Sequence, residues 1–173
     1  MSGFFKLLGR MARHIGFALV GYADRSLTPA VRTRMQGRIA ASETRHTGQL
    51  RIYVESSLPL SYLSRNAAAR ERAITLFGKL RVWDTENNNG VLIYLLMAEH
   101  AIEVVADRGL NQHVSPKRWA EMISRMRIPL REGQWEEGLM LALDEVSAQL
   151  EALYPARPGT TSSNELPDAP IIR

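Results

Sequence analysis

A run of polar side chains between two apolar segments holds the residue types best suited to chemistry. Six consecutive residues, 84–89, carry no apolar side chain, and five of them are Asp84, Glu86, Asn87, Asn88 and Asn89. Carboxylate and amide oxygens are the ligands that calcium and magnesium prefer. The alternation of Asp84, Glu86 and Asn88 is similar to that of the ligands in a calcium-binding loop.

This loop is not an EF-hand. With Asp84 as position 1, Gly90 falls at position 7 instead of 6, and Leu95 stands at position 12, where the bidentate glutamate belongs. A second interpretation needs no ion, because Asn and Asp form turns whose side chains imitate backbone hydrogen bonds, and such runs are commonly solvated. From the residues alone both interpretations stay open.

The flanking segments predict how these side chains are positioned. Gly90–Met97 is a continuous apolar run, typical of a strand buried on both faces. After a short turn at Ala98–His100, Ala101–Ala106 predicts a second strand, so the two form an antiparallel hairpin. The start of one strand then lies beside the end of the other, which brings Asp107 close to Asn89. The candidate calcium or magnesium ligands are therefore Asp84, Glu86, Asn88, Asn89 and Asp107.

The rest of the chain predicts helices around these strands. Gln49–Ser56 alternates apolar and polar residues, as a half-buried strand does. Helices are expected at residues 3–20, from Thr28-Pro29 to near Gly48, from about Ser64 to Leu80, from Ser115-Pro116 to Pro129, and from Gly133 through Leu150. The order predicts an α/β fold: a three-layer α-β-α sandwich around a small mixed sheet, with an N-terminal amphipathic helix.

Composition divides the chain into three parts. A length of 173 residues suits one domain with appendages. We expect a basic amphipathic helix and linker at 1–27, the α/β domain at 28–154, and a Pro- and Ser-rich disordered tail at 155–173.

Cysteine is absent, which excludes disulfides, thiolate nucleophiles and cysteine-ligated metals. No apolar run approaches the roughly 18–20 residues of a membrane span, and no signal peptide is expected. We therefore expect a cytoplasmic protein, peripheral on the inner membrane face.

The amino-terminal segment is the candidate docking surface. Residues 1–40 carry seven basic side chains and one acidic side chain, Asp24, within a chain of net charge +4. In residues 3–20 the apolar side chains recur at helical spacing on one face; they are Phe4, Leu8, Met11, Ile15 and Leu19. Such a helix could lie on an anionic bilayer, or pack against its own domain or a partner's groove. We favour packing of this helix against its own domain or a partner's groove. The partners expected at residues 3–20 are a membrane protein or, in the first interpretation, an anionic membrane surface. No nucleic-acid recognition motif accompanies the charge, and the sequence does not predict an oligomeric state.

Three stretches carry a family resemblance. They are "RVWDTENNNGVLIYLLMAEHAIEVVADRGLN" (81–111), "HTGQLRIYVE" (46–55) and the later "REGQWEEGLMLALDEV" (131–146). Together, over about residues 30–153, they resemble the TPM domain family. The resemblance implies an α-β-α sandwich, a role at the cell envelope, and relatives that bind calcium or hydrolyse phosphate esters. Many relatives have a signal peptide and membrane anchor, neither of which is expected here, so an envelope role would be exerted from the cytoplasmic side.

Two functions follow. The first is a binding or scaffolding module, able to hold a divalent metal and working with a membrane-associated partner. The alternative is a metal-assisted phosphatase built on Asp84 and Asp107. Arg108 could bind phosphate or neutralise the Asp107 carboxylate, and we favour neutralisation. No nucleophile motif or phosphate-binding glycine loop is present, so catalytic residues are not predicted. The four histidines are expected at solvated or capping positions; they are His14, His46, His100 and His113.

Overall fold

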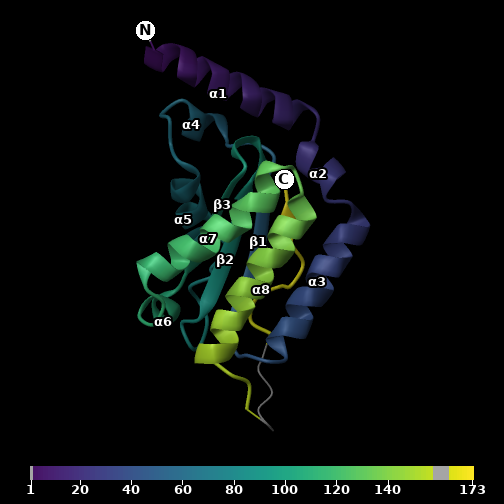
Figure 1. Cartoon of the computed structure of the whole chain (residues 1–173), viewed down its shortest axis with the longest axis vertical. Helices are drawn as coiled ribbons and strands as arrows, with labels where there is room; N and C mark the ends of the chain where they lie inside the picture. The colour runs from purple at the N-terminus through teal and green to yellow at the C-terminus, as the bar shows by residue number, and fades with distance from the viewer. Residues whose placement is uncertain (1, 158–163) are drawn as a thin grey trace.

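The fold is built on a four-stranded mixed sheet (Figure 1). The computed structural model describes residues 2–157 and 164–173, apart from the side chains of residues 2–4 and 6. The strands are β1 (Gln49–Glu55), β2 (Gly90–Leu96), β3 (Ala101–Ala106) and β4 (Ile171–Ile172), in the order β3-β2-β1-β4. β1 runs parallel to β2 and β4, while β3 is antiparallel to β2. The predicted hairpin and the mixed sheet are both confirmed.

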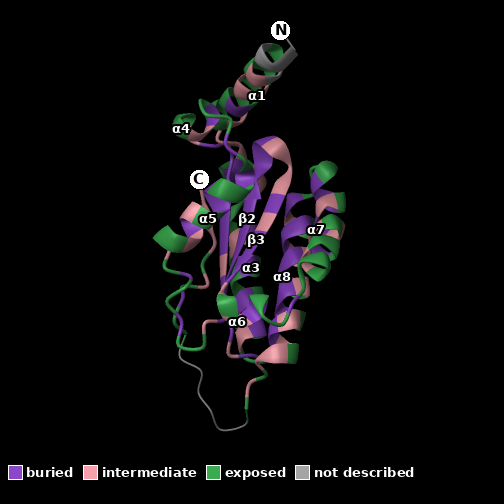
Figure 2. Cartoon of the chain, turned by 90° about the vertical axis from the view of Figure 1, so that its left-hand side faces the viewer, coloured by how far each residue is buried: buried purple, intermediate pink, exposed green. Residues whose placement is uncertain are grey.

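Helices cover both faces of the sheet, which confirms the α-β-α sandwich (Figure 2). One layer contains α3 (Pro29–Glu43), α7 (Pro116–Arg131) and α8 (Trp135–Leu153). The other contains α4 (Leu60–Leu63) and α5 (Ala69–Lys79), while a short α6 (Arg108–Asn111) follows β3. Across the end of the sheet where β1 finishes lie α1 (Ser2–Leu19), α2 (Tyr22–Ser26) and the 3-10 turn η1 (Met97–Glu99).

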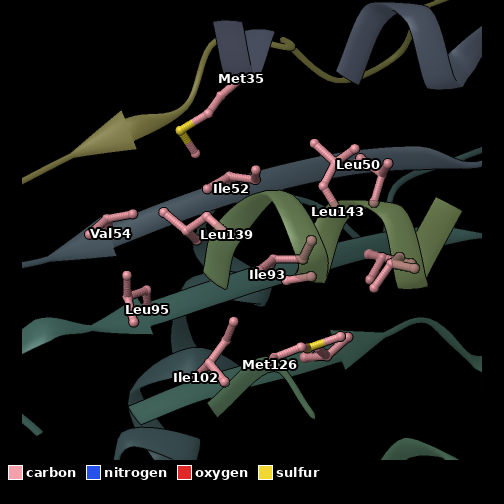
Figure 3. Close-up of a cluster of buried hydrophobic side chains, with 14 of the residues drawn as sticks. Met35, Leu50, Ile52, Val54, Ile93, Leu95, Ile102, Met126, Leu139 and Leu143 are labelled. Carbon is pink, nitrogen blue, oxygen red and sulfur yellow. The ribbon is translucent and has the colours of Figure 1, made fainter. Parts of the chain in front are cut away.

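The core explains why β2 is apolar at every position. All seven of its residues are buried, because alternate side chains enter different hydrophobic clusters. Ile93 and Leu95 point into the cluster under α3, α7 and α8, where Leu139 of α8 and Met126 of α7 also lie (Figure 3). Tyr94 and its alternates Leu92 and Leu96 belong to the cluster under α5.

Several predicted boundaries are wrong. The helix expected from Ser64 to Leu80 begins only at Ala69, as α5, because Asn66 adopts a left-handed conformation (φ 54°) that a continuing helix does not allow. The short α4, at Leu60–Leu63, was not predicted. The helix that Pro129 was expected to end continues to Arg131. Pro129 removes one helical hydrogen bond near the end of α7. The helix then closes with the N–H groups of Gly133 (φ 75°) and Gln134 bonded to the Leu130 and Pro129 carbonyls.

The carboxyl-terminal tail, predicted to be disordered, is ordered where the structure describes it. Residues 158–163 lie outside the described part of the chain. Beyond them the Gln49 side-chain oxygen accepts hydrogen bonds from the N–H groups of Glu165 (2.8 Å) and Leu166 (3.0 Å). Leu166 is buried, and β4 then pairs with β1. The tail thus covers the open edge of β1.

Candidate functional site

The predicted polar site forms at the end of the β2–β3 hairpin where β2 begins. The Asp107 N–H donates to the Gly90 carbonyl (2.9 Å), and the Gly109 N–H donates to the Asn88 carbonyl (3.0 Å). These two bonds bring the polar loop alongside the start of α6. The site therefore lies at the opposite end of the sheet from α1 (Figure 1).

Asn89 and Asp107 each present a buried oxygen that no donor satisfies. Asn89 is fully buried; its N–H donates to Thr85 Oγ1 (3.1 Å) and its Nδ2 to Thr47 Oγ1 (3.4 Å). Asp107 caps α6 by accepting the Arg108 N–H on Oδ1 (2.6 Å). Within the described residues, Asn89 Oδ1 and Asp107 Oδ2 are buried atoms with no hydrogen-bond partner. A buried acceptor left in this state costs about 1–3 kcal/mol, so both oxygens favour a bound water or cation.

Asn88 is engaged by an arginine. Its Oδ1 accepts hydrogen bonds from Arg108 Nε (3.0 Å) and Nη2 (2.7 Å), and its backbone is left-handed (φ 50°), a conformation that Asn tolerates. In the described part of the chain, no ion pair joins Arg108 to Asp107. The expectation that Arg108 neutralises this carboxylate is therefore wrong in this conformation.

The other two predicted ligands, Asp84 and Glu86, are exposed at the surface of the loop. The Oδ2 of Asp84 lies 3.0 Å from Arg81 Nη2. The backbone N–H of Glu86 donates to Glu165 Oε2 (2.9 Å). Among residues 2–157 and 164–173, no cluster of three or more His, Cys, Asp or Glu side chains is arranged to hold a metal. The fit to an ion thus depends on Asn89 and Asp107, with any further ligands coming from backbone carbonyls and water.

Gly90 and Gly109 stand where other parts of the chain come too close to leave room for a side chain. A Cβ on Gly90 would lie 1.9 Å from the Val82 carbonyl oxygen. A Cβ on Gly109 would lie 2.4 Å from the Asn88 carbonyl oxygen and 2.6 Å from the Tyr154 hydroxyl. A larger residue at position 90 would push the start of β2 away from Val82, and one at position 109 would push the polar loop away from α6.

Tyr154 was not predicted as part of this site. It follows α8, and its carbonyl accepts the Thr47 N–H (2.9 Å). Burial raises the pKa of the Tyr154 hydroxyl, and the negative charge of Asp107 raises it further. No local signal could have identified Tyr154, because only the packing of α8 across the sheet brings it here.

One buried and one half-buried titratable group, His46 and Glu43, lie near the start of β1. His46, expected at a solvated position, is fully buried; its Nδ1 is 3.0 Å from the Gly48 carbonyl, and burial lowers its pKa. Glu43 accepts the Leu50 N–H on Oε1 (3.0 Å). Burial raises the pKa of Glu43 to about 7, with a further contribution from the charge of Asp168.

At the other end of the sheet, α1 is attached to the domain by its polar side. His14 is fully buried, and its Nδ1 accepts the Leu58 N–H (3.1 Å), so its Nε2 donates to Glu99 Oε1 (2.9 Å). Arg10 donates to the same oxygen (2.6 Å) and to the Ala67 carbonyl (2.6 Å). Burial alone would raise the pKa of Glu99, but the hydrogen bonds from His14 and Arg10 outweigh it and lower the pKa.

Much of the predicted apolar face of α1 is turned away from the domain, although Phe17 of the same helix packs against the core. Leu8, Ile15 and Leu19 are 53%, 47% and 81% exposed. Packing of this face against its own domain, which was one of the expected roles, is therefore wrong for these three side chains. Among the described residues, no helix is both long enough and apolar enough to cross a membrane.

Comparison with known proteins agrees with this architecture. Residues 22–149 match the model of the TPM domain. The chain belongs to the TPM domain family. A comparison with curated proteins gives no match.

Two solved structures are similar in fold. One is the NMR structure of the BA42 protein from the psychrophilic bacterium Bizionia argentinensis, with 22% identity and a TM-score of 0.72, covering 83% of this chain and 93% of that one. The other is the N-terminal domain of a protein from P. gingivalis, with 22% identity and a TM-score of 0.61, covering 76% and 82% of the two chains. At this identity the likeness shows the fold alone.

Proposed function

We propose that this TPM domain is a binding module that holds calcium or magnesium at Asn89 and Asp107 and works with a membrane-associated partner. The observation that supports the cation site is the pair of buried, partnerless oxygens, Asn89 Oδ1 and Asp107 Oδ2. One belongs to an amide and the other to a carboxylate, the hard ligands that these ions prefer.

The local charges favour a cation over a water molecule. Arg108, the basic side chain next to Asp107, donates its side-chain hydrogen bonds to Asn88. The carboxylate of Asp107 raises the pKa of the nearby Tyr154 hydroxyl. A cation would offset that charge and satisfy both oxygens, whereas one water would satisfy the oxygens alone. Because only two protein side chains contribute, we expect weak binding that is completed by water ligands.

Thermal unfolding with added calcium or magnesium tests this proposal. An ion that binds only the folded state stabilises it by about 2.7 kcal/mol at a concentration one hundred times its Kd. The Asp107→Asn variant should lose this stabilisation, although asparagine can still cap α6. The matched control is Asp84→Asn, at an exposed residue of the same loop, which should respond like the wild-type protein.

Two results would contradict the cation site. One is a wild-type melting temperature that millimolar calcium and magnesium leave unchanged. The other is a response that Asp84→Asn abolishes and Asp107→Asn retains, which would place the ion in the exposed part of the loop.

The same partnerless carboxylate oxygen favours one second candidate, a metal-assisted phosphatase. A carboxylate beside a bound cation can orient water or a phosphate ester. This candidate predicts hydrolysis of p-nitrophenyl phosphate that Asp107→Asn abolishes and Asp84→Asn preserves. If the protein binds the cation but does not hydrolyse p-nitrophenyl phosphate, the phosphatase is excluded and the binding module is retained.

A further inference from the structure

The orientation of α1 is the reverse of what an amphipathic surface helix usually adopts. Such helices bury their apolar face in the core, but here Arg10 and His14 contact the domain. At 100° per residue, Leu8, Ile15 and Leu19 fall within about 40° of one another, whereas Arg10 and His14 lie about 160° and about 120° from the centre of that face. The polar contacts are specific, since Glu99 accepts hydrogen bonds from both residues. The domain therefore holds the apolar face outward.

We propose that α1 lies in the plane of an anionic lipid bilayer, with Leu8, Ile15 and Leu19 inserted at the boundary between headgroups and acyl chains. An in-plane helix of this kind has an apolar face below and basic side chains at the water side. The inference rests on the membrane part of the proposed function and is independent of the cation site.

The charges of α1 favour an anionic bilayer over a second copy of the chain. Residues 2–19 contain no acidic residue and include Lys6, Arg10 and Arg13. The nearby carboxylates already have cationic partners: Asp24 lies 2.5 Å from Arg32, and Glu99 binds Arg10. Two copies of α1 in contact would bring like charges together, which opposes self-association. Arg10 is held by Glu99, so anionic lipid headgroups attract the basic residues of α1 that the domain does not engage, such as the exposed Arg13, at about 1 kcal/mol for each residue near the surface.

Further apolar side chains lie at the same end of the molecule. Val20, directly after α1, is 42% exposed, and Leu60, at the start of α4, is 68% exposed. α4 lies beneath α1 in both views (Figures 1 and 2), and Arg10 joins the two segments by donating to Asn66 Oδ1 just after α4 (2.7 Å).

The polar attachment also fixes how the domain would sit on the bilayer. His14 and Arg10 hold α1 across the end of the sheet where β1 finishes, so this end faces the lipid. Asn89 directly precedes β2 and Asp107 directly precedes α6. Because α6 lies at the opposite end of the molecule from α1 (Figure 1), the cation site would face the aqueous phase. The site would thus be open to soluble ligands while α1 is bound to lipid.

The natural absence of cysteine allows a direct test. Single cysteines introduced as Leu19→Cys and Ile128→Cys are labelled with an environment-sensitive fluorophore in the full chain. Ile128 is the matched control, because it is 63% exposed but lies on α7. Vesicles of phosphatidylcholine containing phosphatidylglycerol should shift the emission at position 19 to the blue and leave position 128 unchanged. Vesicles of phosphatidylcholine alone should produce a much smaller shift.

Vesicle co-sedimentation provides the second measurement. The double variant Leu8→Gln/Leu19→Gln should lower the partition coefficient on anionic vesicles by at least about tenfold, given the apolar area removed. Ile128→Gln should leave it unchanged. Because the substituted side chains are exposed, both proteins should keep the wild-type melting temperature.

Three results would overturn the inference. They are equal binding to neutral and anionic vesicles, equal responses at positions 19 and 128, and no vesicle binding. A dimer in light scattering that Leu8→Gln/Leu19→Gln dissociates would assign the face to a second copy. If the protein does not bind vesicles but calcium still raises its melting temperature, the membrane part of the proposal is wrong and the cation site stands.

Discussion

Glu43 should make the stability of the domain depend on pH. Burial raises its pKa from 4.5 to about 7, so the folded protein binds this proton more tightly than the unfolded chain does. The contribution of Glu43 to stability is then complete below about pH 4.5 and is lost as the pH rises through about 7. The full shift corresponds to about 3 kcal/mol. Because Glu43 keeps some contact with solvent, we expect about half of this, roughly 1.5 kcal/mol.

The Glu43→Gln variant isolates this contribution. Glutamine resembles the protonated glutamate, and its oxygen can still accept the Leu50 N–H. Urea unfolding should therefore give similar stabilities for the two proteins near pH 5 and a more stable variant near pH 8, by about 1.5 kcal/mol. The difference between variant and wild type is the quantity to follow, because His46, whose pKa burial lowers, makes the folded protein lose stability as the pH falls.

Glu132→Gln, at an exposed position after α7, serves as the control and should show no such pH dependence. A Glu43→Gln difference that is constant between about pH 5 and 8 would refute the reasoning, because the carboxyl group would then be ionised in the folded protein as in the unfolded chain. If Glu43→Gln were more stable than the wild type at low pH and not at high pH, the pH dependence would be opposite to the one expected and would also refute the reasoning.

Two further predictions concern the buried ion pair between Arg72 of α5 and Glu55 of β1, and the glycine at the start of β2. Arg72→Met should lower the free energy of unfolding by about 3–5 kcal/mol, because it leaves the buried carboxylate of Glu55 without its bidentate partner. Adding Glu55→Gln should recover part of the loss, and strictly additive effects of the two substitutions would contradict this. Gly90→Ala should lower it by at least about 2 kcal/mol, because the new Cβ meets the Val82 carbonyl. Its control, Gly37→Ala in α3, where a Cβ meets nothing within 4 Å, should raise stability by about 0.5–1 kcal/mol; equal effects of the two alanines would exclude a steric cause. Urea unfolding measures all of these.

Features encoded by neighbouring residues were predictable. The apolar run of β2 could only be buried on two faces, and that required helices on both sides of the sheet. Thr28 and Pro29 predicted the start of α3, which the structure confirms. Hairpin geometry likewise predicted that Asp107 lies beside the polar loop, because antiparallel pairing follows from two strands joined by a short turn.

Features that depend on distant partners were not predictable. Composition showed that α1 is amphipathic, but not which side meets the domain. That choice depends on Glu99, which is 85 residues away from His14 along the chain. The sequence of the polar loop likewise does not say that Asp84 turns toward Arg81 while Asn89 turns inward. The tail was predicted to be disordered because it is rich in Pro and Ser. Only the open edge of β1 gives Ile171 and Ile172 a strand to pair with.

The central claim is that Asn89 and Asp107 form the cation site. The most direct measurement is a crystal structure grown with calcium, in which the ion is located by its anomalous scattering. The account predicts an ion bonded to Asn89 Oδ1 and Asp107 Oδ2 at about 2.3–2.6 Å, with water completing its shell. An ion held by Asp84 and Glu86 at the exposed side of the loop, or no ion at millimolar calcium, would contradict it.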